Sequence, residues 1–122
     1  MKYDRQDAFT RAYLGLASQG FERSLSNVTL ACRYRGPNGL KCAIGWLMPD
    51  DKYDANMEGR SAHSHPVVSA VWPEDSNAAA YDMNFLHGLQ RCHDGAYTPE
   101  HMKQSLASLA KLYNLTVPEV PA

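Results

Sequence analysis

The sequence predicts a single α+β domain that is mostly helical and carries one small β-hairpin. Three observations lead to this prediction. The chain is 122 residues long, apolar residues recur at helical spacing near both ends, and a turn rich in proline and glycine follows an alternating segment near residue 30. No repeat or linker divides the chain, so residues 1–122 are expected to fold as one globular unit.

Helices are expected at both ends of the chain. Apolar residues three or four positions apart predict a helix over residues 5–19, with Asp4 as its N-cap and Gly20 at its end. Pro66 suits the first turn of a short helix that begins after Ser64 or His65 and stops before Pro73. One longer helix is predicted from about Asn77 to His93. A last helix is predicted from Thr98, with Met102, Leu106, Leu109 and either Leu112 or Tyr113 as its apolar stripe and Asn114 at its end.

The hairpin prediction comes from residues 28–42. Apolar and polar residues alternate over 28–35, including Leu30, and the turn Gly36-Pro37-Asn38-Gly39 follows. A three-residue loop keeps apolar residues on one face, so we expect Cys32, Tyr34, Leu40 and Cys42 to point inward and Arg33, Arg35 and Lys41 to point outward. Residues 43–48 fit either the rest of the second strand or a helical turn that ends at Pro49.

Composition narrows the classes of protein to consider. Hydrophobic residues make up 44% and charged residues 20%, which argues against disorder, and no apolar run is long enough to span a bilayer. No secretory signal is visible at the N-terminus, so we expect three free thiols in a cytoplasmic protein. Residues 1–47 carry seven Lys/Arg and three Asp/Glu, a net charge of +4, whereas residues 48–122 carry five and ten, a net charge of −5. This asymmetry can steer a charged partner toward one end.

Part of the chain resembles a family of small bacteriophage and prophage proteins. The resemblance covers about a third of the chain and has two parts. The longer part runs from Cys32 through Tyr34-Arg35-Gly36-Pro37, Gly39 and Lys41-Cys42-Ala43-Ile44-Gly45 to Pro49-Asp50-Asp51, Tyr53 and Glu58-Gly59. The weaker part runs from Phe85-Leu86 to His93-Asp94. The resemblance implies a phage-type origin and little chemistry. Many small phage proteins act by binding a host factor, host defence machinery included. We therefore expect an accessory protein that binds a host protein or complex inside the host cell, without catalysis and without a cofactor.

Five residues are the predicted partner-binding surface. Arg33, Arg35 and Lys41 lie on the outward face of the predicted hairpin, and Trp46 and Tyr53 follow it. Arginine and aromatic residues dominate the energetically important positions of protein interfaces. A basic hairpin can also grip phosphates, but three charges make a thin patch for nucleic acid, so a host protein is the favoured partner.

Two other kinds of site compete with this interpretation. A thiol enzyme would use Cys42 as its nucleophile and a histidine such as His93 as its base, although burial of Cys42 on the apolar face is the more ordinary expectation. A zinc site would use Cys32, Cys42, Cys92 and His93, which supply four ligands but lack the Cys-x-x-Cys spacing of zinc ribbons. We therefore predict neither a catalytic residue nor a metal, and we expect a non-catalytic binding protein.

Overall fold

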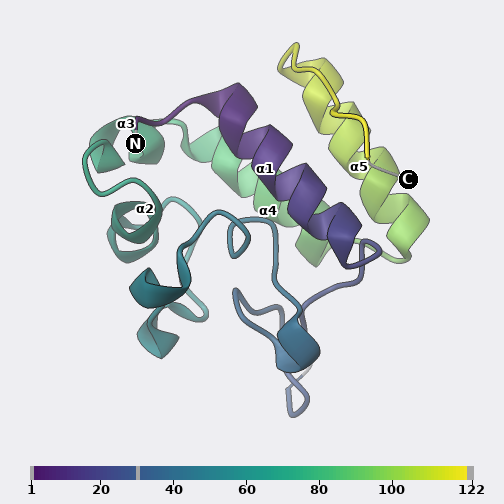
Figure 1. Ribbon diagram of the computed structural model, residues 1–122, viewed down its shortest axis with the longest axis horizontal. Helices are drawn as coiled ribbons and strands as arrows, with labels where there is room; N and C mark the ends of the chain where they lie inside the picture. The colour runs from purple at the N-terminus through teal and green to yellow at the C-terminus, as the bar shows by residue number, and fades with distance from the viewer. Residues whose placement is uncertain (1, 30, 121–122) are drawn as a thin grey trace.

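The computed structural model describes residues 2–29 and 31–120, and its α-helices in these ranges are α1 (Arg5–Ser18), α2 (His65–Val71), α3 (Ser76–Tyr81), α4 (Met83–Asp94) and α5 (Pro99–Leu112). Three short 3-10 turns lie between α1 and α2: η1 (Pro37–Gly39), η2 (Asp50–Lys52) and η3 (Ala55–Met57). Figure 1 shows α1, α4 and α5 on one side of the molecule and the irregular segment that joins α1 to α2 on the other.

The first and last helices form as predicted, because their ends are fixed by local chemistry. The Asp4 carboxylate accepts a hydrogen bond from the backbone N–H of Asp7 at 2.8 Å and caps α1. Thr98 caps α5 in the same way through the N–H of His101 at 3.0 Å. Gly20 and Asn114 have positive φ angles of 67° and 57°, which end the two helices as left-handed residues do.

The helix predicted from Asn77 to His93 is two helices, so this prediction is wrong in one respect. The break lies at Asp82, whose φ of −88° and ψ of 39° interrupt the helical geometry between α3 and α4. The cause is tertiary, because the Asp82 carboxylate accepts hydrogen bonds from Tyr3 Oη at 2.5 Å and from Arg5 Nη2 at 2.7 Å. Helix propensity along the sequence carries no sign of these partners.

The predicted β-hairpin does not form, and the α+β prediction is wrong. The structure is 53% helical and 3% strand, and no sheet occurs in the part of the chain that it describes. Two isolated antiparallel bridges, Leu25–Cys32 and Arg35–Lys41, are what remains of the expected pairing; the expectation for Leu30 falls outside the described residues. The chain is therefore a helical domain.

The hairpin fails because other groups take the backbone hydrogen bonds of its first strand. The N–H of Arg33 donates to the carbonyl of Ser24 at 2.9 Å. The N–H groups of Tyr34 and Arg35 donate to the carboxylate of Glu58 at 2.8 and 3.2 Å. The three-residue turn itself is confirmed, since the N–H of Gly36 donates to the carbonyl of Leu40 at 2.8 Å. The segment is thus paired with a loop and a side chain rather than with a second strand.

Residues 43–48 form consecutive hydrogen-bonded turns and are neither a strand nor a regular helix. The N–H of Trp46 donates to the Cys42 carbonyl at 3.1 Å, and the N–H of Leu47 to the Ile44 carbonyl at 3.0 Å. Gly45 makes this packing compatible with the preceding segment, because a Cβ atom at this position would overlap the carbonyl oxygen of Tyr34.

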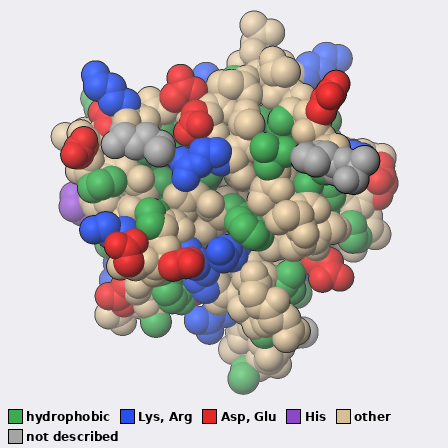
Figure 2. Space-filling model, viewed as in Figure 1, with side chains coloured by type: hydrophobic (Ala, Val, Ile, Leu, Met, Phe, Trp, Pro, Cys, Tyr) green, Lys and Arg blue, Asp and Glu red, His purple; other side chains and the backbone are tan. Residues whose placement is uncertain are grey.

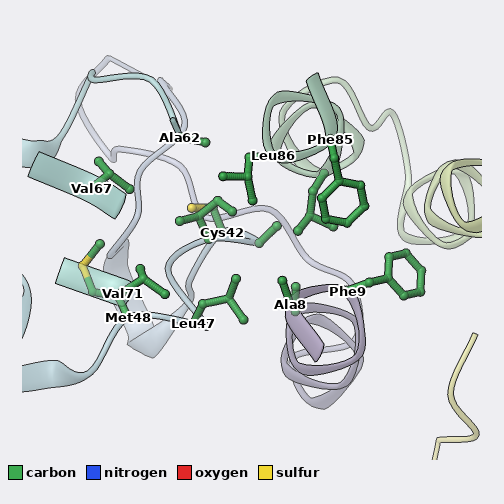
Figure 3. Packing of buried hydrophobic residues seen from close by; sticks show 14 of the residues in the cluster. Ala8, Phe9, Cys42, Leu47, Met48, Ala62, Val67, Val71, Phe85 and Leu86 are labelled. Carbon is green, nitrogen blue, oxygen red and sulfur yellow. The ribbon is translucent and has the colours of Figure 1, made fainter. Parts of the chain in front are cut away.

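The hydrophobic core joins the irregular segment to the helices. Figure 3 shows Cys42 near the centre of the cluster, between Val67 and Val71 of α2 and Leu86 of α4. Phe9 of α1 and Phe85 of α4 are fully buried at the other end of the cluster. Trp72 is also fully buried. The irregular segment is therefore anchored in the core through Cys42 and its neighbours rather than laid over the surface.

Candidate functional site

The three basic residues of the predicted surface are half-buried and bonded to acidic groups of the same chain. Arg35 has 17% of its side chain exposed, forms an ion pair with Asp50, and donates from Nη2 to the Met48 carbonyl at 2.6 Å. Lys41 Nζ lies 3.8 Å from Asp50 and 4.5 Å from the centre of the Trp46 ring. The prediction that the side chains of Arg35 and Lys41 point outward is therefore wrong, because loop residues that are distant in sequence cover both of them.

Glu58 is the hub of this arrangement. Its side chain is 14% exposed and accepts hydrogen bonds from the N–H groups of Tyr34 and Arg35 and from Tyr53 Oη, the last at 2.6 Å. Arg33 Nη2 lies 3.6 Å from the same carboxylate. One carboxylate therefore fixes the segment 33–35 and the loop that carries Tyr53.

The charge of the basic cluster is mostly compensated within the chain. Three cations (Arg33, Arg35, Lys41) and two carboxylates (Asp50, Glu58) leave a net charge of +1. Figure 2 accordingly shows basic and acidic side chains interspersed on the face in view, without a large area of one sign. Such a surface does not favour nucleic acid, for which affinity comes from many uncompensated cations. Trp46 is half-buried, and its Nε1 donates to Gln19 Oε1 at 3.0 Å.

A shallow groove of about 290 Å³ lies beside the segment 33–37, and we call it the arginine groove. It is lined by Ser26, Asn27, Val28, Arg33, Arg35, Gly36 and Pro37. The Ser26 hydroxyl accepts hydrogen bonds from the N–H groups of Val28 at 3.1 Å and Thr29 at 3.2 Å, which fixes the turn. This turn presents Val28 with 90% of its surface exposed, next to the partly exposed side chain of Arg33.

Cys42 is fully buried, in agreement with the ordinary expectation for this residue. Its thiol accepts from the N–H of Gly45 at 3.4 Å. Burial raises the pKa of Cys42 to about 12. The thiol is therefore protonated at neutral pH and closed off from substrate, which is the opposite of what a nucleophile needs.

Of the four predicted zinc ligands, the structure brings Cys32 and His93 together but not Cys42 or Cys92. Within residues 2–29 and 31–120, Cys32, His93 and Asp94 form a group whose possible ligand atoms all lie within 4.8 Å of one another. Neither Cys42 nor Cys92 belongs to this group. Burial raises the pKa of Cys32 to about 11 and that of Cys92 to about 11, so both thiols are protonated. A zinc ion would have to displace the proton of each thiol that it bound.

The hydrogen bonds of His93 also leave no nitrogen for a metal. His93 is fully buried, and the N–H of Ser24 donates to its Nε2 at 2.8 Å. Nε2 is therefore unprotonated, and Nδ1 carries the proton, which it donates to Asp94 Oδ1 at 2.8 Å. Both nitrogens are occupied. His93 thus holds the segment at Ser24 and orients Asp94, and it is available neither as a ligand nor as a base for Cys42.

A second concavity, which we call the polar pocket, lies on the other side of the segment 32–35. It measures about 240 Å³ and is lined by Cys32, Tyr34, Gly59, Arg60, Ser61, Ala62, His87, Gln90 and Asp94. Cys32, Tyr34 and Gly59 belong to the first part of the family-like pattern, and Gln90 and Asp94 lie in the second part. The two parts, which are far apart in sequence, therefore meet around one pocket.

Sequence reasoning missed the residues that organise both concavities. Glu58, Ser24, Gln19 and Gln90 were not predicted as site residues, and Asp94 entered as the last residue of the family-like pattern. The signal that could have found Glu58 and Asp94 was their place in that pattern beside residues predicted to bind a partner. Their partners are backbone N–H groups and a buried histidine, which no spacing rule predicts.

No protein-family model matches the chain, and no curated protein or solved structure matches it either. The resemblance to a phage family therefore stays a prediction based on the residues named above. Within the described ranges, no helix is long and apolar enough to cross a membrane.

Proposed function

We propose that this chain is a small phage-type accessory protein that binds a host macromolecule without catalysing a reaction. The observation that carries the proposal is the arginine groove, where a fully exposed apolar tip at Val28 adjoins the guanidinium of Arg33. Arginine is enriched among the energetically important residues of protein interfaces, and the exposed Val28 side chain beside it adds apolar surface that a protein partner can cover. A protein partner suits this groove better than nucleic acid, given the compensated charge of the cluster.

The groove is preorganised by bonds within the chain. Glu58 holds the segment 33–35 from behind, and Ser26 holds the turn that presents Val28. A surface that is already ordered loses less conformational entropy when a partner docks. Among the predicted contact residues, Arg33 and Arg35 line the groove, and Arg33 is the more exposed of the two, at 38% against 17%. Inhibition of host defence machinery is the first biological role to examine for such a binding protein.

The proposal is tested by site-specific photocrosslinking in host lysate. A photoreactive amino acid at position 28 should crosslink to a defined host protein, and Arg33→Ala should reduce that crosslink about tenfold or more, as expected for an interface anchor. The matched control carries the photoreactive group at Leu112 on α5, which is also exposed (77%) but lies away from the groove.

Three results would contradict the proposal. Equal crosslinking from positions 28 and 112 would show a sticky protein rather than a specific surface. A crosslink at position 28 that Arg33→Ala leaves unchanged would remove the groove from the interface. A product that disappears on nuclease treatment would assign the groove to nucleic acid and revive the nucleic-acid alternative.

A further inference from the structure

The polar pocket is lined by a carboxylate, that of Asp94, which His93 and Gln90 hold in place by hydrogen bonds. Asp94 Oδ1 accepts from His93 Nδ1 at 2.8 Å and from Gln90 Nε2 at 3.3 Å. The thiol of Cys32, which also lines the pocket, hydrogen-bonds to the Asp94 side chain. The Asp94 side chain is 39% exposed. A fully buried histidine thus orients a partly exposed carboxylate on the wall of a pocket that a ligand can reach.

Arg60 also lines the pocket and does not pair with this carboxylate. Arg60 Nε donates to the Asn56 carbonyl at 3.2 Å, and within the described ranges the guanidinium makes no other polar contact. Arg60 and Asp94 both line the pocket, yet they form no ion pair within 4.0 Å. Two opposite charges in a cavity of about 240 Å³ therefore remain unneutralised by each other.

The charges around the pocket disfavour a ligand with one sign of charge. A simple cation would meet Asp94 but also Arg60, and Arg23 adds a second guanidinium that donates to the Asp94 carbonyl at 3.4 Å. A simple anion would meet Arg60 but also the fixed carboxylate of Asp94. A molecule that carries both charges satisfies both groups, because like-charge contacts are costly in a partly enclosed site.

We infer that the polar pocket binds a small zwitterion of the α-amino acid type, with its ammonium on the Asp94 carboxylate and its carboxylate on Arg60. The pocket is smaller than the ~300–1,000 Å³ typical of sites for drug-sized ligands, which suits a molecule of this size. Tyr34 and His87 supply rings, and Cys32 a neutral thiol, for contact with the rest of the ligand. This site lies across the segment 32–35 from the arginine groove and does not depend on the proposed function.

The test is an NMR titration of the isotope-labelled full chain with each standard L-α-amino acid in turn. A binder should shift the amide signals of residues 59–62 and 87–94. The tightest binder is then compared with its decarboxylated amine and its deaminated acid, which each keep one charge. We expect both analogues to bind about tenfold more weakly or worse, since each loses one charge-assisted contact.

Two variants assign the contacts. Asp94→Asn keeps the oxygen that accepts from His93 and should weaken the amino acid about tenfold, while the acid analogue, which has no ammonium, binds as before or better. Arg60→Gln should weaken the amino acid similarly and leave the amine analogue unaffected. Arg91→Gln and Glu100→Gln, exposed positions outside the pocket, are the matched controls and should change nothing.

The inference is overturned if no amino acid shifts these amides, if both variants bind as wild type does, or if an analogue with a single charge binds as tightly as the zwitterion. Its failure is separable from failure of the host-binding proposal. Arg33→Ala should leave amino acid binding intact, and Asp94→Asn should leave the crosslink from position 28 intact.

Discussion

Phe85 on α4 and Glu58 in the irregular segment both lie largely out of solvent, but they stabilise their surroundings by different means. Phe85 is fully buried and packs edge-to-face against Tyr113, with the ring centres 5.1 Å apart. Glu58 accepts hydrogen bonds from two backbone N–H groups and one tyrosine. The backbone groups around Phe85 are hydrogen-bonded within α4, so this region is held to its neighbours by apolar packing. The backbone N–H groups near Glu58 have no partner in a helix or sheet, and the Glu58 carboxylate accepts their hydrogen bonds instead.

This difference holds for the two regions as a whole. The helices α1, α4 and α5 satisfy their own backbones and meet through apolar side chains. The segment 19–62 depends on a few polar side chains. Gln19, at its start, accepts through Oε1 from the N–H of Lys41 at 3.0 Å, and Gln90 of α4 accepts through Oε1 from the N–H of Ile44 at 3.2 Å. Single polar substitutions should therefore be nearly as damaging in the segment as core substitutions are in the helices.

The largest effect is expected from Phe85→Ala, which sets the scale for the helical region. Removing a fully buried ring should lower the free energy of unfolding by about 3–5 kcal/mol. Urea denaturation followed by circular dichroism measures this change. Leu112→Ala, at a position 77% exposed on α5, should cost less than about 0.5 kcal/mol. Equal effects of the two substitutions would mean that α4 and α5 do not pack as described.

The next largest effect is expected from Glu58→Gln in the irregular segment. The amide cannot accept at both of its terminal atoms, so at least one of the buried N–H groups of Tyr34 and Arg35 loses its acceptor. We expect a loss of about 3 kcal/mol in the free energy of unfolding, since hydrogen bonds to a charged group are at stake. Glu22→Gln is the matched control, at an exposed carboxylate in the same segment. A loss below about 0.5 kcal/mol would show that Glu58 is not the hub.

The same difference explains which parts of the structure were predictable from sequence. The ends of α1, α2 and α5 depend on residues within one turn, such as Asp4 and Thr98, and a local pattern is enough to place them. The strand over 28–35 was predicted from alternation alone, but whether a strand forms depends on what pairs with it. Glu58, 23 or 24 residues further along, takes those hydrogen bonds, and local alternation carries no information about that.

The candidate sites follow the same rule. The burial of Cys42 was predictable because its neighbours are apolar. The partners of Arg35 and Lys41 were not, because Asp50 reaches them through the fold. His93 was considered as a base or a metal ligand from its residue type. Its actual role depends on the direction of one hydrogen bond from the backbone of Ser24, which lies 69 positions away.

A smaller effect is expected from His93→Phe, which removes a buried hydrogen bond between α4 and the segment 19–62. An aromatic ring is kept, but the N–H of Ser24 loses its acceptor and Asp94 loses a donor, so we expect a loss of about 2 kcal/mol. Hydrogen exchange at the Ser24 amide should accelerate in the variant.

The wild-type protein supplies an independent check on His93. Imidazole ¹⁵N shifts should show a protonated Nδ1 and an unprotonated Nε2 at neutral pH. The opposite tautomer would contradict the hydrogen-bond direction from which both the orientation of Asp94 and the exclusion of a metal follow. His87→Phe, an exposed position on the same helix, is the control and should leave the Ser24 amide unchanged.

The smallest effect, about 1 kcal/mol, is expected at Asp82, the polar contact that the helical region uses between α3 and α4. Burial alone would raise the pKa of Asp82, but hydrogen bonds from Arg5 and Tyr3 outweigh burial and lower it below the ordinary value. Because the folded-state pKa is depressed, the stabilisation is complete above the unfolded-state pKa of about 3.9 and is lost as the pH falls through the folded-state pKa.

Asp82→Asn should therefore destabilise the protein near neutral pH and make the difference from wild type shrink in acid. Urea midpoints measured on both sides of this range test the sign, with Asp51→Asn at an exposed carboxylate as the control. A difference that grows in acid would mean that the junction of α3 and α4 is not held by an ionised carboxylate, and Asp82 would then not support the helical region as Glu58 supports the segment 19–62.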